Sequence, residues 1–327
     1  MVHLPVSVMP DHTPVNLSVH VVHGKSEGPT LFVSAAVHGD EVIGVEIVRR
    51  LLHSPALKGL KGTLLAVPIV NTFGFMNHSR YLPDRRDLNR SFPGSAGGSL
   101  AARLAHIFLN EVVLRADFGI DLHSAAIHRT NLPQVRVTTA SRTAESYAHH
   151  FGAPLTLHAR LREGSLRAVA AQNGVEMLLY EAGEGLRFDE YAVRVGVSGC
   201  LNVMRAMGML KARPNKRPPP KPLDCSSSSW LRSPAGGLLR AYRTIGDVVE
   251  QGTVLGQVAD PFGTTEKEVV AHQAGLIIGR TNLPVVNEGD GLFHIAQIES
   301  KVSHGWELDD SHPLLEQGAL LDEDEII

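Results

Sequence analysis

An apolar segment that runs directly into a polar turn does most to limit the folds open to this chain. Leu31–Val37 is a short run of apolar and small residues with β-branched members, and Gly28-Pro29 precedes it. Such a run predicts a strand that is covered on both faces, as in a parallel sheet. His38 and Glu41 follow three positions apart, and an amphipathic segment begins at Val42. The pattern predicts a strand, a turn and a helix, with both polar side chains just beyond the sheet edge.

Strands and helices alternate through the first two thirds of the chain. Further strands are predicted at 16–22, 63–70, 116–123, 134–139 and 175–180, and helices at 100–114, 144–151, 166–172 and 190–207. Residues 1–28 are expected to form an edge strand or a hairpin. The alternation predicts an α/β fold, with a mostly parallel mixed sheet flanked by helices.

Several residues with metal-binding or acid-base chemistry follow directly on these strands. His38 and Glu41 end the first, His123 ends the strand at 116–123, and Glu181 ends the strand at 175–180. Ligands bind beyond the carboxyl ends of the strands in sheets of this kind. The irregular segment 72–98 is long for a compact domain, which favours a functional loop. The sequence therefore predicts one site at one edge of the sheet.

The residues at this edge have the chemistry of a catalytic zinc site. His38, Glu41 and His123 would supply three ligands to one zinc ion and leave a fourth position open for water. Zinc lowers the pKa of bound water to about 7. Glu181 could then act as general base and pass the proton to a leaving amine. Asp121, two positions before His123 on the same strand face, could orient a ligand from behind.

The loop at 72–98 could bind the substrate. Arg80 could stabilise the oxyanion as a carbonyl becomes tetrahedral. Asn89 and Arg90 could bind a substrate carboxylate, because a guanidinium grips a carboxylate with two hydrogen bonds.

Each of these residues also has an ordinary structural interpretation. His123 taken alone fits a core histidine, and Glu41 fits a favourable carboxylate in the first turn of a helix. Glu181 fits a salt-bridged turn residue, with Glu184 as a competitor for its role. Arg80 and Arg90 fit a solvated loop. Their shared position at strand ends favours the site.

The last third of the chain has a different pattern. Residues 211–229 are rich in proline and serine, which predicts an extended connector. Segments 233–252 and 271–289 resemble each other, which suggests a small pseudo-symmetric β barrel or sandwich. The predicted division is a catalytic domain (1–222), a linker (223–229), a β domain similar to lipoyl and biotinyl domains (230–298) and an acidic tail (299–327). Lys267 lacks the flanking residues of a cofactor carrier.

Composition excludes several classes of function. The net charge of −3 does not favour a nucleic-acid or anionic-membrane partner. No apolar run approaches the ~20 residues of a membrane span. Cys200 and Cys225 build no disulfide framework, and the N-terminus lacks a secretory signal, so we expect a cytoplasmic protein.

Four segments together resemble the succinylglutamate desuccinylase/aspartoacylase family, which is similar to the zinc carboxypeptidases in fold and metal site. They are His38-Gly39-Asp40-Glu41, the run 80–94, Asp121-Leu122-His123 and the strand ending at Glu181. The resemblance implies His38, Glu41 and His123 as zinc ligands, Glu181 as the catalytic glutamate, Arg80 as the carbonyl-polarising residue, and Asn89 and Arg90 as the carboxylate-binding pair. Arg167 is a candidate for the family's substrate-side arginine.

The leading hypothesis is therefore a zinc amidohydrolase that cleaves a small N-acyl amino acid, either N-acetyl or N-succinyl. Both acidic and basic product amino acids stay open, and so does a homo-oligomeric state. The alternatives are a zinc carboxypeptidase that acts on peptides and a non-catalytic binding or carrier protein with a lipoyl-like domain.

Overall fold

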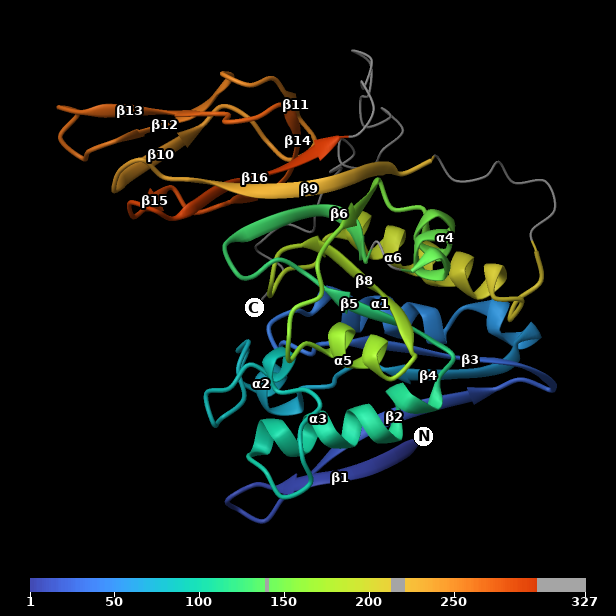
Figure 1. Ribbon diagram of the computed structural model, residues 1–327. Helices are drawn as coiled ribbons and strands as arrows, with labels where there is room; N and C mark the ends of the chain where they lie inside the picture. The colour runs from blue at the N-terminus through green and yellow to red at the C-terminus, as the bar shows by residue number, and fades with distance from the viewer. Residues whose placement is uncertain (139–140, 213–220, 299–327) are drawn as a thin grey trace, which may run out of the picture.

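The computed structural model describes residues 1–138, 141–212 and 221–298. Within these residues a mixed sheet of twelve strands crosses the molecule in the order β1-β2-β4-β3-β5-β8-β6-β7-β9-β16-β14-β11 (Figure 1). In chain order these strands are β1 (Val2–Val8), β2 (Pro14–His23), β3 (Ser26–Ala35), β4 (Lys61–Val67), β5 (Phe118–His123), β6 (Arg129–Val137), β7 (Leu155–His158), β8 (Glu176–Gly183), β9 (Leu223–Arg232), β11 (Val248–Val249), β14 (Gly275–Thr281) and β16 (Gly291–Ile298).

The middle of this sheet is parallel. Strands β4, β3, β5 and β8 pair in parallel with one another, and β5 is buried along its whole length. Both faces of such strands are covered, which explains their continuous apolar runs. Their carboxyl ends meet at one edge of the sheet, as the sequence predicts. β1 and β2 form the antiparallel hairpin expected for the N-terminal residues.

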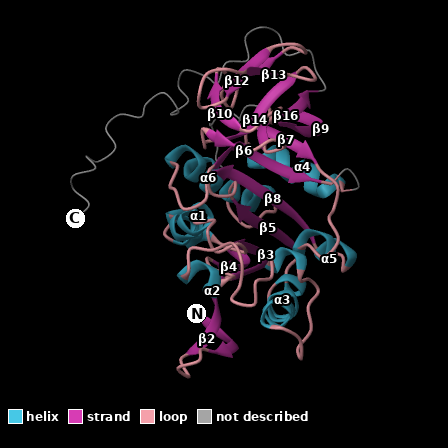
Figure 2. Cartoon of the chain, turned by 90° about the vertical axis from the view of Figure 1, so that its left-hand side faces the viewer, coloured by secondary structure: helices cyan, strands magenta, loops and turns pink. Residues whose placement is uncertain are grey.

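Helices cover both faces of the sheet (Figure 2). α1 (Ile43–Leu52), α4 (Arg142–Phe151) and α6 (Glu190–Ala206) pack into one buried core, and α3 (Leu100–Glu111) and α5 (Leu166–Gln172) pack into another. The short α2 (Thr72–Met76) follows β4. Short 3-10 turns span Pro55–Gly59, Leu88–Arg90 and Val113–Arg115. The predicted helices agree with these bounds within a few residues.

Helix α1 shows why this packing is close. Ile43, Ile47, Val48 and Leu51 recur at helical spacing and are fully buried. A Cβ added at Gly44 would lie 2.7 Å from the Cβ of Ala35 and 2.8 Å from that of Leu122. The glycine therefore lets α1 lie directly on β3 and β5.

The segment predicted as a linker, 223–229, lies in strand β9. β9 pairs in parallel with β7 and antiparallel with β16, so it continues the sheet from the α/β part into the C-terminal strands. This pairing satisfies the edge of β7, which would otherwise expose unpaired backbone groups. The expected unpaired connector is a paired strand at these residues, because a run of serines is compatible with a strand, and the linker boundary itself stays a prediction.

The described residues after β9 form strands only. β13 (Glu266–Val270), β12 (Val254–Ala259), β10 (Gly237–Ala241) and β15 (Val285–Val286) make a second sheet in that order. β10 of the first repeat pairs with β15 of the second, and β14 of the second pairs with β11 of the first. This exchange is what a two-fold repeat of segments 233–252 and 271–289 predicts. The lipoyl-like fold and the domain boundaries stay predictions.

The remaining predictions concern the acidic tail, the proline-rich connector, Lys267 and membrane-spanning segments. The acidic tail at 299–327 lies outside the described residues, as does part of the proline-rich connector. Lys267 lies within strand β13, and its ammonium donates to the carbonyl of Pro234. In the described part of the chain, no helix has the length and apolarity needed to cross a membrane.

Candidate active site

The turn between β3 and α1 holds His38 and Glu41 through close backbone packing. Gly39 lies against the backbone of helix α2, and a Cβ added there would lie only 1.9 Å from the carbonyl carbon of Gly74. Only glycine fits this contact. The turn is therefore fixed by the α2 backbone, and its two polar side chains point toward the strand ends.

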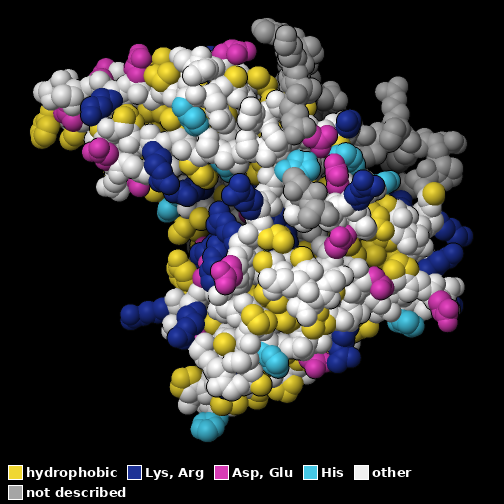
Figure 3. Space-filling view, in the orientation of Figure 1, with side chains coloured by type: hydrophobic (Ala, Val, Ile, Leu, Met, Phe, Trp, Pro, Cys, Tyr) yellow, Lys and Arg dark blue, Asp and Glu magenta, His cyan; other side chains and the backbone are white. Residues whose placement is uncertain are grey.

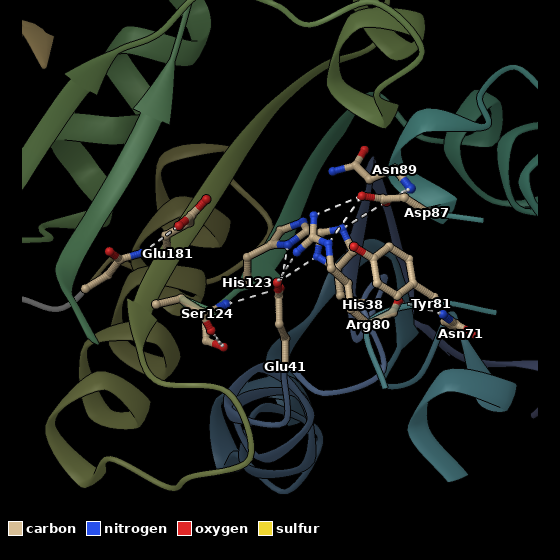
Figure 4. Close-up of polar contacts among 12 residues, drawn as sticks. His38, Glu41, Asn71, Arg80, Tyr81, Asp87, Asn89, His123, Ser124 and Glu181 are labelled. Atoms are coloured by element: carbon tan, nitrogen blue, oxygen red, sulfur yellow. Dashed lines mark hydrogen bonds and ion pairs between the residues drawn. The ribbon is translucent and has the colours of Figure 1, made fainter. Parts of the chain in front are cut away.

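His38, Glu41 and His123 converge as the sequence predicts (Figure 4). Nδ1 of His38 lies 2.7 Å from Oε1 of Glu41, and Nδ1 of His123 lies 2.6 Å from Oε2. All three residues are buried, and ligand atoms from the three lie within 4.8 Å of one another. Two imidazoles and one carboxylate from two separate segments therefore face a common point.

The second nitrogen of each imidazole faces another carboxylate. Nε2 of His123 lies 2.7 Å from Asp121, whose other oxygen accepts a 2.7 Å hydrogen bond from the Ser34 hydroxyl. Nε2 of His38 lies 3.2 Å from Asp87. Carboxylates in this position orient metal-binding histidines and raise their basicity. This donor set, with three protein ligands, fits a catalytic zinc ion.

The charges of these groups are strongly coupled. Burial by itself would lower the pKa of His123, but the carboxylates of Asp121 and Glu41 hold that pKa well above its ordinary value. Burial would raise the pKa of Glu41, but the two histidines hold it well below its ordinary value. The Glu41 carboxylate is therefore ionised in the folded protein and attracts positive charge to this point.

Arg80 reaches the cluster from the loop after α2. Its Nη2 donates to Oδ2 of Asp87 at 3.0 Å, and its Nη1 lies 3.5 Å from Oε1 of Glu41. Asp87 thus joins His38 to Arg80. Burial would raise the pKa of Asp87, but His38 and Arg80 together hold it low. The guanidinium is fixed beside the candidate metal position.

Glu181 lies on the strand next to His123. The two residues are register partners in the parallel pair β5–β8. The Glu181 carboxylate accepts hydrogen bonds from Nδ2 of Asn131 at 2.7 Å and from Nη2 of Arg136 at 3.2 Å. In Figure 4 its side chain stands apart from those of His38 and His123. Both His123 and Glu181 line the same cleft.

Asn89, Arg90 and Arg167 also line this cleft. Oδ1 of Asn89 accepts a 2.9 Å hydrogen bond from the backbone N–H of Leu166, so this oxygen anchors the start of α5. Arg90 is exposed. Burial is the largest cause that lowers the pKa of Arg167, and the positive charge of Arg136 is the second; together they bring it to about 10.

The cleft has a volume of about 770 Å³ and a strongly cationic lining. Figure 3 shows basic side chains gathered in the hollow between the C-terminal strands and the α/β part. Eight arginines line it: Arg80, Arg90, Arg129, Arg136, Arg160, Arg162, Arg167 and Arg232. The acidic residues of the lining are Glu41, Asp121 and Glu181. A chain with a net charge of −3 thus concentrates positive charge at this site.

Sequence reasoning missed several residues of the cleft. Asp87 received no role, although it stands within the loop that carries Arg80 and Asn89. Arg136 lies on β6, which is antiparallel to β8 and so enters the site from the opposite direction. Trp230 and His294 come from β9 and β16. The signal available in the sequence was the presence of polar residues in the middle of these strands, which indicates a strand face that borders a polar cleft.

The comparison with protein families decides the relationship. The sequence model of the succinylglutamate desuccinylase/aspartoacylase catalytic domain matches residues 27–207. The chain belongs to this family. The resemblance found in the sequence is therefore confirmed.

Two curated relatives in the family are deacylases. The chain is 27% identical over 288 residues to N-alpha-acetyl-L-2,4-diaminobutyric acid deacetylase of Halomonas elongata, with 84% of each chain covered. It is 28% identical over 183 residues to succinylglutamate desuccinylase of Pseudomonas aeruginosa, with 51% of each chain covered.

Solved structures in the family share the fold over most of the chain. A succinylglutamate desuccinylase/aspartoacylase from Rhodobacter sphaeroides superposes with a TM-score of 0.81 at 23% identity, covering 90% of this chain and 94% of that one. The product-bound ectoine utilization protein EutE (DoeB) from Ruegeria pomeroyi gives a TM-score of 0.81 at 24% identity, covering 90% and 93%. At these identities the likeness establishes the α/β fold.

Proposed function

We propose that this family member is a zinc-dependent amidohydrolase that removes a small acyl group from an N-acyl amino acid. The observation that carries the proposal is the buried group His38–Glu41–His123, with a carboxylate behind each imidazole. The deacetylase and the desuccinylase among the relatives support amide hydrolysis.

One zinc ion per chain would be held by His38, Glu41 and His123. Bound there, it would supply a Lewis acid beside the scissile carbonyl and lower the pKa of a water molecule to about 7. The ionised carboxylate of Glu41 and the orientation of His123 by Asp121 prepare the ligands for a cation.

Glu181 is the proposed general base and acid. Its register pairing with His123 in β5 and β8 supports this role, because Glu181 lines the same cleft as the proposed metal ligands. There it would take a proton from the attacking water and deliver it to the nitrogen of the departing amine. Asn131 and Arg136 hold the carboxylate by hydrogen bonds.

Arg80 is proposed to stabilise the oxygen of the scissile carbonyl as negative charge develops on it. Its hydrogen bonds to Asp87 fix the guanidinium and leave it facing Glu41. Asn89 and Arg90 are proposed to bind the substrate carboxylate, through the amide nitrogen and the exposed guanidinium. Arg167 follows Leu166, whose backbone N–H donates to Asn89 at the start of α5. Arg167 is the candidate for the arginine that faces the substrate in this family.

The acyl group is proposed to be acetyl or succinyl, because relatives with these two activities match the chain. We also propose a cytoplasmic protein whose partner is the small substrate. A carboxypeptidase with the same chemistry would act on peptides, and a lipoyl-like carrier would hold a modified Lys267. Lys267 lies within a strand, which favours the enzyme.

A substrate panel tests the proposed function. Amine release would be measured with N-acetyl and N-succinyl derivatives of acidic and basic amino acids and with dipeptides and tripeptides of the same residues. The proposal expects hydrolysis of N-acyl amino acids and little hydrolysis of the peptides. Preferential release of C-terminal residues from the peptides would favour the carboxypeptidase. Intact mass with a modified Lys267 and no hydrolysis of the panel would favour the carrier.

A further inference from the structure

Strand β6 joins the α/β part to the C-terminal strands at the level of Glu181. Along one edge it pairs with β8, where Gln134 is the register partner of Glu181. Along the other edge, residues 129–131 pair antiparallel with β14, which belongs to the last third of the chain. The start of β6 is therefore held between the strand that carries Glu181 and a strand of the C-terminal part.

Asn131 lies at this junction with a glycine on either side. Its register partners are Gly183 in β8 and Gly279 in β14. Asn131 is only 5% exposed. A Cβ added at Gly279 would lie 2.7 Å from Oδ1 of Asn131 and 3.3 Å from the carbonyl oxygen of Thr130. The glycine of the C-terminal strand therefore leaves the space that the Asn131 carboxamide occupies.

The carboxamide of Asn131 presents its donor to Glu181. Nδ2 donates a 2.7 Å hydrogen bond to Oε2 of Glu181. The opposite orientation would place the amide oxygen against a carboxylate oxygen, and a carboxylate accepts hydrogen bonds but donates none. Oδ1 is consequently the atom that faces Gly279. The packing at Gly279 and the hydrogen bond to Glu181 thus select the same orientation.

Both donors to Glu181 reach the same carboxylate oxygen. Nη2 of Arg136 lies 3.2 Å from Oε2, which also accepts the hydrogen bond from Asn131. In the part of the chain that the structure describes, we find no hydrogen bond to Oε1. A carboxylate oxygen has about two lone-pair sites, so these two donors occupy Oε2. Oε1 is the oxygen that is left to exchange a proton.

The end of β14 is tied to the residues just before Asn131. The backbone N–H of Asn282 donates to the carbonyl of His128 at 2.8 Å, and its Nδ2 donates to the Thr130 hydroxyl at 2.6 Å. His128 has a φ of 64°, in the left-handed region that residues with a side chain rarely adopt. The contacts from Asn282 hold this turn and, with it, the start of β6.

We propose that strand β14 positions the proposed general base through Asn131. Gly279 and Asn282 hold Asn131 in place. Asn131, together with Arg136, then fixes Oε2 of Glu181 and leaves Oε1 to carry the proton. An O–H bond of the attacking water breaks as Oε1–H forms, and Oε1–H breaks as an N–H bond forms on the departing amine.

The inference rests on the proposed function and deepens it. It assigns the proton transfer to one oxygen, and it gives the C-terminal strands a part in that transfer. Asn131 is a positioning residue, because it acts through Glu181. Its hydrogen-bond donor is already satisfied by that carboxylate.

A purely structural role for Asn131 would have a different kinetic signature. Loss of stability lowers the amount of folded enzyme, whereas a displaced base lowers kcat of the folded enzyme and leaves KM near its wild-type value. Positioning also makes the effect of Asn131 depend on Glu181, because residues that act as a unit have non-additive effects. Both signatures can be measured on purified, folded protein.

Asn131→Ala tests the hydrogen bond to Glu181. We expect kcat to fall about tenfold to a hundredfold, the size of a lost hydrogen bond to a charged group. In a Glu181→Gln background the same change should alter kcat by less than about twofold. A loss in that background as large as in the wild type would overturn the proposal.

Gly279→Ala tests the contribution of the C-terminal strand. The new Cβ displaces Oδ1 of Asn131, so kcat should fall about tenfold, but the change should add little in an Asn131→Ala background, where that oxygen is absent. Gly236→Ala is the matched control and should keep the wild-type kcat, because the nearest atoms to a Cβ there lie 3.8 Å away.

An unchanged kcat in Gly279→Ala would overturn the proposal. If Gly279→Ala does not fold, Asn282→Ala replaces it, because that change removes the hydrogen bond to Thr130 without adding atoms. A kcat of Asn282→Ala equal to that of the wild type would then overturn the proposal.

Crystal structures separate this inference from the proposed function, because they need no turnover. The wild type should show Oε2 of Glu181 on Asn131 and Arg136, and Asn131→Ala and Gly279→Ala should show the carboxylate rotated away from that position. If the protein hydrolyses no member of the substrate panel but Glu181 moves in this way, the amidohydrolase fails while the positioning by β14 stands. An unmoved Glu181 carboxylate in both variants would overturn the positioning, with or without hydrolysis.

Discussion

His123 and Glu181 occupy the same level of two neighbouring parallel strands, β5 and β8. Adjacent strands lie about 4.8 Å apart, so this register fixes the separation of the two backbones. One residue is a candidate metal ligand and the other the candidate proton carrier. The fold thereby holds the backbones of the two candidate residues as neighbours without depending on a flexible loop.

Replacement of Glu181 by Gln should remove the proton carrier and keep the side-chain volume. We expect kcat to fall about a hundredfold to ten-thousandfold, which is the usual contribution of a general base. Metal content should stay at the wild-type level, because Glu181 is not among the three clustered ligands. Steady-state kinetics and metal analysis of the same sample provide the measurement.

Glu184→Gln is the matched control for that change. The Glu184 carboxylate accepts hydrogen bonds from the backbone N–H of His128 and from Asn282, so it joins two loops. We expect this variant to retain most of the activity. Equal losses in the two variants would contradict the assignment of Glu181 as the proton carrier.

Asp121→Asn should weaken metal binding. The carboxylate of Asp121 lies 2.7 Å from Nε2 of His123, and an amide would orient the ring less well. Metal affinity should fall about tenfold to a hundredfold in competition with a chelator. Asp117→Asn is the control, because among the described residues the Asp117 carboxylate accepts a hydrogen bond from the backbone of Thr30 and lies away from the histidines. An unchanged affinity in Asp121→Asn would show that the imidazole does not need this partner.

Gly39→Ala should destabilise the turn that carries two of the candidate ligands. The new Cβ would lie 1.9 Å from the Gly74 carbonyl carbon, so the backbone must move. We expect a loss of about 1–3 kcal/mol in the free energy of unfolding, as in overpacked sites. Gly59→Ala is the control, because a Cβ there meets no atom of the described residues within 4 Å. Denaturant unfolding that is alike in both variants would refute the packing argument.

Acid should weaken the contact between helices α1 and α6. Arg50 donates hydrogen bonds to both Glu46 and Glu190. The hydrogen bond from Arg49, and after it the one from Arg50, lowers the pKa of Glu46 to about 2. Hydrogen bonds from Arg50 lower the pKa of Glu190 to about 2 as well. A carboxylate whose pKa is lower in the folded protein than in the unfolded chain stabilises the fold at pH values above its unfolded pKa. That contribution is present above about pH 4.5 and is lost as pH falls toward 2.

The variant Arg50→Gln tests this pH dependence. Its free energy of unfolding at pH 7 should be lower than that of the wild type by about 1 kcal/mol, because these side chains are partly exposed. The difference should narrow as pH falls from 4.5 toward 2. Denaturant titrations across this range provide the measurement, and a difference that is independent of pH would contradict the ion-pair account.

The convergence of the candidate metal ligands could be predicted because His38 and His123 stand at or just after the ends of apolar strands, with Glu41 in the turn after His38. In a parallel sheet these ends lie at one edge, and β3 and β5 are neighbours in the sheet, so His38 and His123 converge. The role of Asp87 could not be predicted in this way, because the loop conformation that brings it to His38 depends on contacts with distant segments. His294 is further removed, since it reaches the cleft only through the pairing of β16 with β9.

The serine run at 226–229 shows the same limit. Local composition favours a connector, yet β9 is a strand because β7 and β16 both pair with it. Strand formation here depends on partners about 70 residues away along the chain, such as Ser228 with Ala296. Sequence patterns describe local preference, and such non-local pairing overrides it.

Metal analysis of the wild type and of His123→Ala, coupled to amine release from N-acyl amino acids, tests the central claim most directly. The account predicts one zinc ion per chain and hydrolysis in the wild type, and loss of both in the variant. Full zinc occupancy and full activity in His123→Ala would contradict it.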